Sequence, residues 1–152
     1  SITVQIIYII IDIIFNSIEI SPIFRNHLKK KFGNKIELFE NDAKNLKDII
    51  NNNSIDKILL INVIYFLNPL DLYLKEFKRI LDEDEIVFIA GKFEAVKTFN
   101  NDVFQNKEIS DLLKILKKFF KVSYEFVDLG DLNSRYYAIY LKKQGLFMFE
   151  CL

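Results

Sequence analysis

The sequence has 152 residues, 51% of them hydrophobic and 28% charged, which suits one folded domain with a buried core and excludes a disordered segment. Basic and acidic residues both number 21, so no net charge would draw the protein to nucleic acid or to an acidic membrane. The single cysteine, Cys151, excludes an internal disulfide and any cysteine-pair zinc site. We therefore expect a cytoplasmic protein without a metal site.

The first element, residues 1–15, is very apolar but too short to span a membrane. Gln5 and Asp12 interrupt it, and a spanning helix needs roughly 20 apolar residues. No lysine or arginine occurs before Arg25, so the basic start of a secretory signal is missing. We expect a buried element here, and the residues leave open whether it is a helix or a strand.

Two further strand candidates enclose a helix. Residues 17–20 predict a short strand, and Ser21-Pro22 is typical of a helix start, because an N-cap residue precedes a proline at the first helical position. This helix should run to about Gly33, with the only histidine, His27, at its surface or boundary. Residues 36–39 predict the next strand.

The second half of the chain alternates strands and helices. Residues 56–61 have the continuous apolar core of a strand buried on both faces. Six apolar residues after Pro69 recur at helical spacing: Leu70, Tyr73, Leu74, Phe77, Ile80 and Leu81. The acidic residues 82–85 predict a solvated turn, residues 86–90 a fourth buried strand, and residues 109–120 a second amphipathic helix.

Residues 122–126 and 135–141 predict two strands with no helix between them. A short connection joins antiparallel strands, so these two should form a hairpin. The earlier alternation of strands and helices requires crossover connections and therefore a parallel sheet.

This order of elements resembles that of class I S-adenosylmethionine-dependent methyltransferases over residues 17–142. Residues 17–22 (SIEISP) are similar to the family's second strand and the start of its next helix. Residues 36–43 (IELFENDA) are similar to its third strand and turn, and residues 56–66 (DKILLINVIYF) to its fourth strand and loop. The resemblance implies one domain, residues 1–152. Its class would be α/β, with a three-layer, mostly parallel Rossmann-like methyltransferase sheet that ends in an antiparallel hairpin.

The resemblance also implies how S-adenosylmethionine would bind. Glu19 would hold the two ribose hydroxyls, since an ionised carboxylate only accepts hydrogen bonds and can hold both at once. Ile20 would lie near the adenine, Asp42 and Ala43 would contact it, and Asn62 would lie beside the methionine part. Methyl transfer is an in-line displacement helped mainly by positioning, so no catalytic residue is named.

The sequence departs from the family at its most specific motif. The family has a strand and a Gly-x-Gly-x-Gly loop before its first helix, whereas the four glycines here, Gly33, Gly91, Gly130 and Gly145, all follow Glu19. Residues 1–15 would be that first helix in a chain incomplete at its N-terminus, or a first strand that has lost the motif. A chain lacking its central strand should expose sheet edges and associate with itself.

Three functions remain open. The leading one is S-adenosylmethionine-dependent methyl transfer to an unidentified acceptor, this chain being a truncated form. The alternatives are a catalytically inactive methyltransferase-like interaction module and another nucleotide-binding α/β domain. Several of these residues also have a simpler interpretation. Glu19 would be a solvated carboxylate, and Asp42 would cap a short turn. Tyr65 and Phe66 would be core residues rather than the lining of an acceptor pocket.

Overall fold

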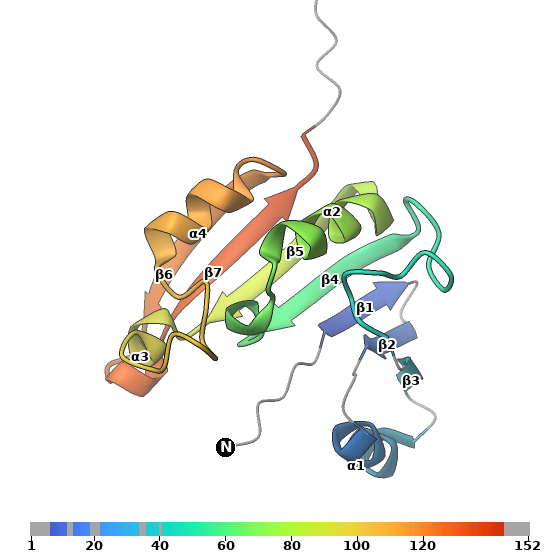
Figure 1. Cartoon of the computed structure of the whole chain (residues 1–152), viewed down its shortest axis with the longest axis horizontal. Coiled ribbons are helices and arrows are strands. Elements are labelled where there is room, and N and C mark those ends of the chain that lie inside the picture. Colours follow the sequence, from blue (N-terminus) through green and yellow to red (C-terminus); the bar gives the residue numbers. More distant parts are fainter. Residues whose placement is uncertain (1–6, 12–13, 19–21, 34–35, 40, 145–152) are drawn as a thin grey trace, which may run out of the picture.

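The computed structural model describes residues 7–11, 14–18, 22–33, 36–39 and 41–144. Figure 1 shows one twisted sheet with helices packed against it. In chain order the elements are β1 (Ile7–Ile11), β2 (Ile14–Ile18), α1 (Pro22–Phe32), β3 (Ile36–Phe39), β4 (Ile55–Ile61), η2 (Ile64–Phe66), α2 (Leu70–Ile80), β5 (Leu81–Gly91), α3 (Phe93–Val96), α4 (Ile109–Leu116), β6 (Lys121–Asp128), η3 (Leu132–Ser134) and β7 (Arg135–Lys142).

The seven strands lie in the order β3-β2-β1-β4-β5-β7-β6. β2 pairs with β3, and β4 with β5, in parallel, whereas β1 and β7 are antiparallel to both of their neighbours. Five strands, β2 to β6, therefore run in one direction and two run against them. This confirms the mostly parallel sheet and its C-terminal antiparallel hairpin.

β1 decides between the two interpretations of the N-terminal segment. Residues 7–11 form a strand, so the interpretation of this part as a helix is wrong, and isoleucine-rich composition favours the extended backbone. β1 pairs with β2 (Ile7 with Ile18) and with β4 (Ile7 with Leu60), so it lies inside the sheet between these two strands. The gap expected from a missing central strand is therefore filled.

The crossovers place helices on both faces of the sheet. The β2–α1–β3 and β4–α2–β5 units cross the sheet in opposite directions. Right-handed parallel crossovers that run in opposite directions put their helices on opposite faces. α2 and α4 lie together on one face (Figure 1), and the sheet with its two helical faces forms the three predicted layers.

The core lies under α2 and α4. Buried side chains of α2 and α4, such as Phe77 and Leu116, belong to one cluster with buried residues of β4, β5 and β7. Within β4, Ile58 and Leu60 are fully buried, whereas Lys57 is exposed and Ile61 is 43% exposed. The expected burial of this strand on both faces is therefore incomplete.

Two predicted boundaries were wrong. Residues 82–85 are part of β5, because the backbone becomes extended at Leu81 directly after α2 and Leu81 pairs with Ile55 of β4. Residues 82–84 are nevertheless exposed, as expected. α4 ends at Leu116 rather than near residue 120. The bounds of the other predicted elements differ from the structure by at most three residues, and His27 is exposed on α1 as predicted.

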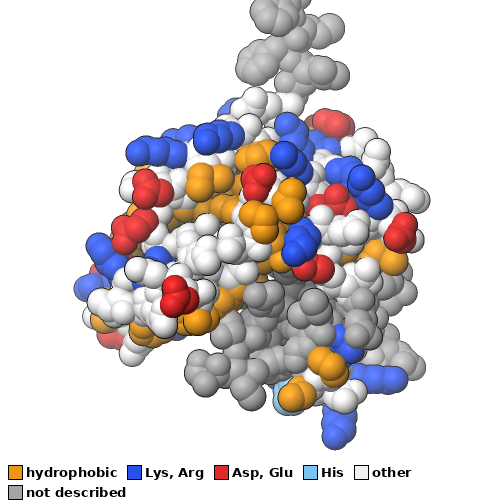
Figure 2. Space-filling view, in the orientation of Figure 1, with side chains coloured by type: hydrophobic (Ala, Val, Ile, Leu, Met, Phe, Trp, Pro, Cys, Tyr) orange, Lys and Arg blue, Asp and Glu red, His pale blue; other side chains and the backbone are white. Residues whose placement is uncertain are grey.

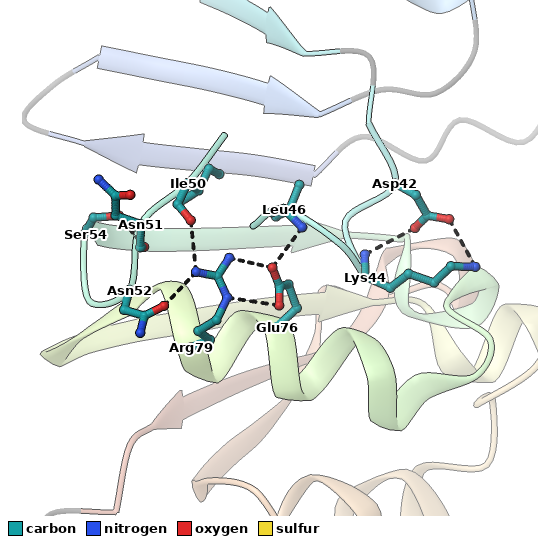
Figure 3. A network of polar contacts seen from close by, with 9 residues as sticks. All are labelled: Asp42, Lys44, Leu46, Ile50, Asn51, Asn52, Ser54, Glu76 and Arg79. Carbon is teal, nitrogen blue, oxygen red and sulfur yellow. Dashed lines mark hydrogen bonds and ion pairs between the residues drawn. The ribbon is translucent and has the colours of Figure 1, made fainter. Parts of the chain in front are cut away.

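A buried ion pair fastens the segment before β4 to α2 (Figure 3). Glu76 Oε1 lies 2.5 Å from Arg79 Nη2 and accepts a 2.8 Å hydrogen bond from the backbone N–H of Leu46. Arg79 Nη1 donates to the backbone oxygen of Ile50 at 2.9 Å and to Asn52 Oδ1 at 2.8 Å. One pair of charged side chains thus satisfies two backbone groups of this irregular segment, the N–H of Leu46 and the oxygen of Ile50.

Candidate functional site

The carboxyl ends of the parallel strands meet at one edge of the sheet. β4 ends at Ile61 and β5 at Gly91, and these two neighbours run in the same direction. In open α/β sheets, ligands bind outside the carboxyl ends of the strands, near the point where the strand order reverses. This edge, beside β1 and β4, is therefore the candidate site.

Asn62 joins the ends of the two central strands. Its backbone N–H donates to the oxygen of Ala90 at 2.8 Å, and its Oδ1 accepts from the backbone N–H of Lys92 at 3.3 Å. Its φ is +55°, a left-handed conformation that asparagine tolerates better than most residues. The side chain is exposed. Of the predicted site residues that the structure describes, Asn62 is the one directly at this edge.

Tyr65 follows Asn62 in the η2 turn and points into the core. Its side chain is 1% exposed, and its ring packs edge-on against Phe93 at 5.1 Å between centroids. Burial raises the pKa of its hydroxyl far above the ordinary value, and the nearby backbone of Lys92 opposes this only in part. The backbone N–H of Lys92 donates to Asn62 Oδ1 instead. The Tyr65 hydroxyl has no hydrogen-bond partner among the described residues. The core interpretation of Tyr65 thus agrees with its burial.

Tyr65→Phe should therefore leave the free energy of unfolding unchanged or raise it by up to about 1 kcal/mol, because it removes an unsatisfied buried hydroxyl. Urea titration would measure the change. Tyr73→Phe is the matched control on α2: burial, and then the carboxylate of Asp42, raises the pKa of the Tyr73 hydroxyl. This hydroxyl has a partner, so its removal should cost about 1 kcal/mol. Equal losses of unfolding free energy in both variants would contradict the interpretation of the Tyr65 hydroxyl as a buried group without a hydrogen-bond partner.

Asp42 and Ala43 follow β3, whose carboxyl end lies on the same edge as those of β2 and β4. Asp42 Oδ1 accepts from the backbone N–H of Lys44 at 3.2 Å, and its Oδ2 lies 3.2 Å from Lys44 Nζ. These contacts close the turn that the sequence suggested Asp42 would cap (Figure 3). Ala43 is 3% exposed and packs in the core cluster. Glu19 and Ile20 lie outside the described residues; β2 ends at Ile18, directly before them.

The described residues fit only part of an S-adenosylmethionine site. Only residues 12 and 13 separate β1 from β2, and neither is a glycine. β1 also runs opposite to β4, so its carboxyl end at Ile11 lies at the far edge of the sheet. The strand, glycine loop and helix through which a backbone approaches this cofactor closely are therefore not formed between β1 and β2. The end of β4 at Asn62 does fit.

A cleft of about 380 Å³ lies next to this edge, between the loop that precedes α4 and α4 itself. Its wall includes Phe104, Leu112 and Ile115, together with the charged residues Lys107, Glu108 and Asp111. The sequence did not predict this cleft, because the loop has no periodic pattern. Phe99 and Val103 of this loop are each about half exposed, which only the structure shows.

The part of the chain that the structure describes holds no candidate metal site and no helix that could span a membrane. No group of three or more metal-binding side chains comes together there. No helix within the same residues is both long and apolar enough to cross a membrane.

Comparisons with known proteins agree with the architecture. Residues 11–89 match the family described as methyltransferase domain. The chain is similar to the solved structure of an S-adenosylmethionine-dependent methyltransferase from Thermotoga maritima, with a TM-score of 0.61 and 18% identity over 85% of this chain and 72% of that one. It is also similar to one from Archaeoglobus fulgidus, with a TM-score of 0.65 and 15% identity over 84% of this chain and 75% of that one. A third such structure, from Methanosarcina mazei, has a TM-score of 0.65 and 12% identity over 84% of this chain and 81% of that one. At these identities the structures establish the fold. A comparison with curated proteins gives no match.

Proposed function

This chain belongs to the methyltransferase domain family, and from that premise we propose that it serves S-adenosylmethionine-dependent methyl transfer to an acceptor still to be identified. The match over residues 11–89 carries the proposal, because it covers β2 to β4, the end of β4 at Asn62 and most of β5. S-adenosylmethionine is the cofactor of this family. The truncated form expected from the sequence, and a cytoplasmic location, remain parts of the same proposal.

The arrangement at the end of β4 supports this function. Asn62 is exposed at the carboxyl edge and holds the ends of β4 and β5 together through Ala90 and Lys92. β2 points its carboxyl end toward the same edge, so that Glu19 follows a strand that runs parallel to β4. In this proposal Glu19, Ile20, Asp42 and Ala43 serve the nucleoside end of the cofactor. Asn62 serves its methionine end.

Calorimetric titration of the chain with S-adenosylhomocysteine tests the proposal. We expect saturable binding that NAD does not displace, and about a tenfold loss of affinity in Glu19→Ala. Asn62→Gly should cause a similar loss, since glycine keeps the positive φ while the side-chain oxygen is removed. Glu83→Ala is the matched control, because this exposed carboxylate lies at the opposite end of β5. Displacement by NAD would instead favour a different nucleotide-binding domain.

One observation favours a second candidate, the catalytically inactive methyltransferase-like interaction module. The two-residue connection between β1 and β2 leaves no place for the glycine loop. If S-adenosylhomocysteine does not bind while the chain melts cooperatively as a folded domain, this second function is the better one. Saturable binding by the unmodified chain would instead favour the methyltransferase.

A further inference from the structure

The cleft beside α4 is held open by hydrogen bonds that fix its loop. The backbone N–H of Gln105 donates to the oxygen of Tyr65 at 2.8 Å. Asn106 Nδ2 donates to the backbone oxygens of Ile64 and Leu67, both at 2.9 Å. These bonds tie the loop to the η2 turn after β4, so the cleft is formed before any ligand arrives. Binding there would require little reorganisation.

One part of the cleft wall is apolar. Phe104 packs against Phe66 at 4.9 Å and against Phe99 at 5.0 Å between ring centroids, and it lines the cleft together with Leu112 and Ile115 of α4. Figure 2 shows hydrophobic side chains gathered on this face of the molecule. A volume of about 380 Å³ is within the range of small-molecule sites and suits a ligand with one ring or a short chain.

The charged groups at the cleft favour a cation. Lys107 Nζ is used, because it donates to the backbone oxygen of Phe99. The carboxylate of Glu108 has no hydrogen-bond or ion-pair partner within the described residues, and Asp111 has only an exposed partner, Lys114, at 3.9 Å. The cleft wall therefore carries two carboxylates and one lysine, Lys107, whose ammonium group is already hydrogen-bonded. An anionic ligand would be repelled, and a neutral ligand would leave the carboxylates unused.

We propose that this cleft binds a small organic cation, an amine carried on an apolar ring or chain. The apolar body lies against Phe104, Leu112 and Ile115, and the ammonium group lies between Glu108 and Asp111. The assignment concerns binding alone, and it holds whether or not the chain transfers methyl groups.

Three probes with the same phenyl ring and different charge test this assignment: 2-phenylethylamine, 2-phenylethanol and 3-phenylpropionate. Each is titrated into the full chain by calorimetry near neutral pH, where an alkylamine is protonated. We expect saturable binding of the amine, at least about tenfold weaker binding of the alcohol, and no binding of the carboxylate. Ethylamine, which lacks the ring, should also bind at least about tenfold more weakly than 2-phenylethylamine.

Paired variants identify the site. The double variant Glu108→Gln with Asp111→Asn should lower amine affinity about tenfold. Glu83→Gln with Asp84→Asn, which removes two exposed carboxylates at the start of β5, should leave it unchanged. The proposal is overturned if the amine does not bind, if the alcohol binds as tightly, or if the first double variant keeps the affinity. In that last case Glu108 and Asp111 would serve only the N-terminus of α4. S-adenosylhomocysteine titrations are separate, so failure here leaves the methyltransferase proposal standing.

Discussion

Glu76→Ala should lower the free energy of unfolding by about 4 kcal/mol, measured by urea titration at neutral pH. The substitution leaves the Arg79 guanidinium, 19% exposed, without its carboxylate partner, and it leaves the backbone N–H of Leu46 without an acceptor. Breaking a buried ion pair on one side costs about 3–5 kcal/mol, because the remaining charge stays buried and uncompensated. Asn52 and the oxygen of Ile50 still accept from Arg79, so the protein should remain folded.

Asp71→Ala on the same helix is the matched control. Asp71 also forms an ion pair one helical turn away, with Lys75 at 3.8 Å, but both side chains are more than half exposed. Exposed pairs contribute at most about 1 kcal/mol, so this loss should be small. A loss in Glu76→Ala no larger than that of Asp71→Ala would contradict the role assigned to the buried network.

The same network predicts a pH dependence. Burial opposes ionisation of Glu76, but hydrogen bonds from Arg79 and Leu46, with the charges of Arg79 and Lys47, hold its pKa below the ordinary 4.5. A carboxylate whose pKa is lowered by folding contributes stability that is complete above its unfolded pKa and is lost as the pH falls through its folded pKa. The stability difference between the wild type and Glu76→Gln should therefore shrink below about pH 4.5. A difference independent of pH would refute this.

Gly91→Ala should lower the free energy of unfolding by about 2 kcal/mol, again by urea titration. A Cβ at this position would lie 2.5 Å from Phe93 Cε2 and 2.7 Å from the Tyr65 hydroxyl oxygen. Both rings are almost fully buried, at 2% and 1% exposure, so neither can move aside without disturbing the core. Overpacking a core in this way typically costs about 1–3 kcal/mol.

Gly33→Ala separates steric from conformational effects. Gly33 has a φ of +56° at the end of α1, and a Cβ there would meet no atom within 4 Å. The free energy of unfolding should fall by about 1 kcal/mol in Gly33→Ala, from backbone strain alone.

A double variant tests the clash at Gly91. Combining Gly91→Ala with Phe93→Leu provides space for the new methyl group, so the double variant should lose less stability than the sum of the two single variants. If the loss in the double variant equals the sum of the two single losses, a clash with Phe93 is not the cause of the Gly91→Ala loss.

Part of the candidate site could be predicted from the sequence. The apolar run 56–61 predicts a strand, the resemblance puts Asn62 at its end, and Asn62 lies at the carboxyl edge of β4. The burial of Tyr65 and Ala43, by contrast, depends on segments distant in the chain. Tyr65 is covered by Phe93 and Phe104, about 30 and 40 residues further on. No local pattern around Tyr65 contains that information.

The sequence by itself determined the order and type of most elements. The helical spacing in α2, the Ser21-Pro22 start of α1 and the apolar runs of β4 and β5 are local patterns, and local propensity agreed with the fold. Only the tertiary structure decided that residues 7–11 form a reversed strand inside the sheet, that residues 82–85 extend β5 and that Glu76 is buried against Arg79. Strand direction, strand pairing and burial depend on contacts between distant segments, and the same short apolar run is compatible with several of them.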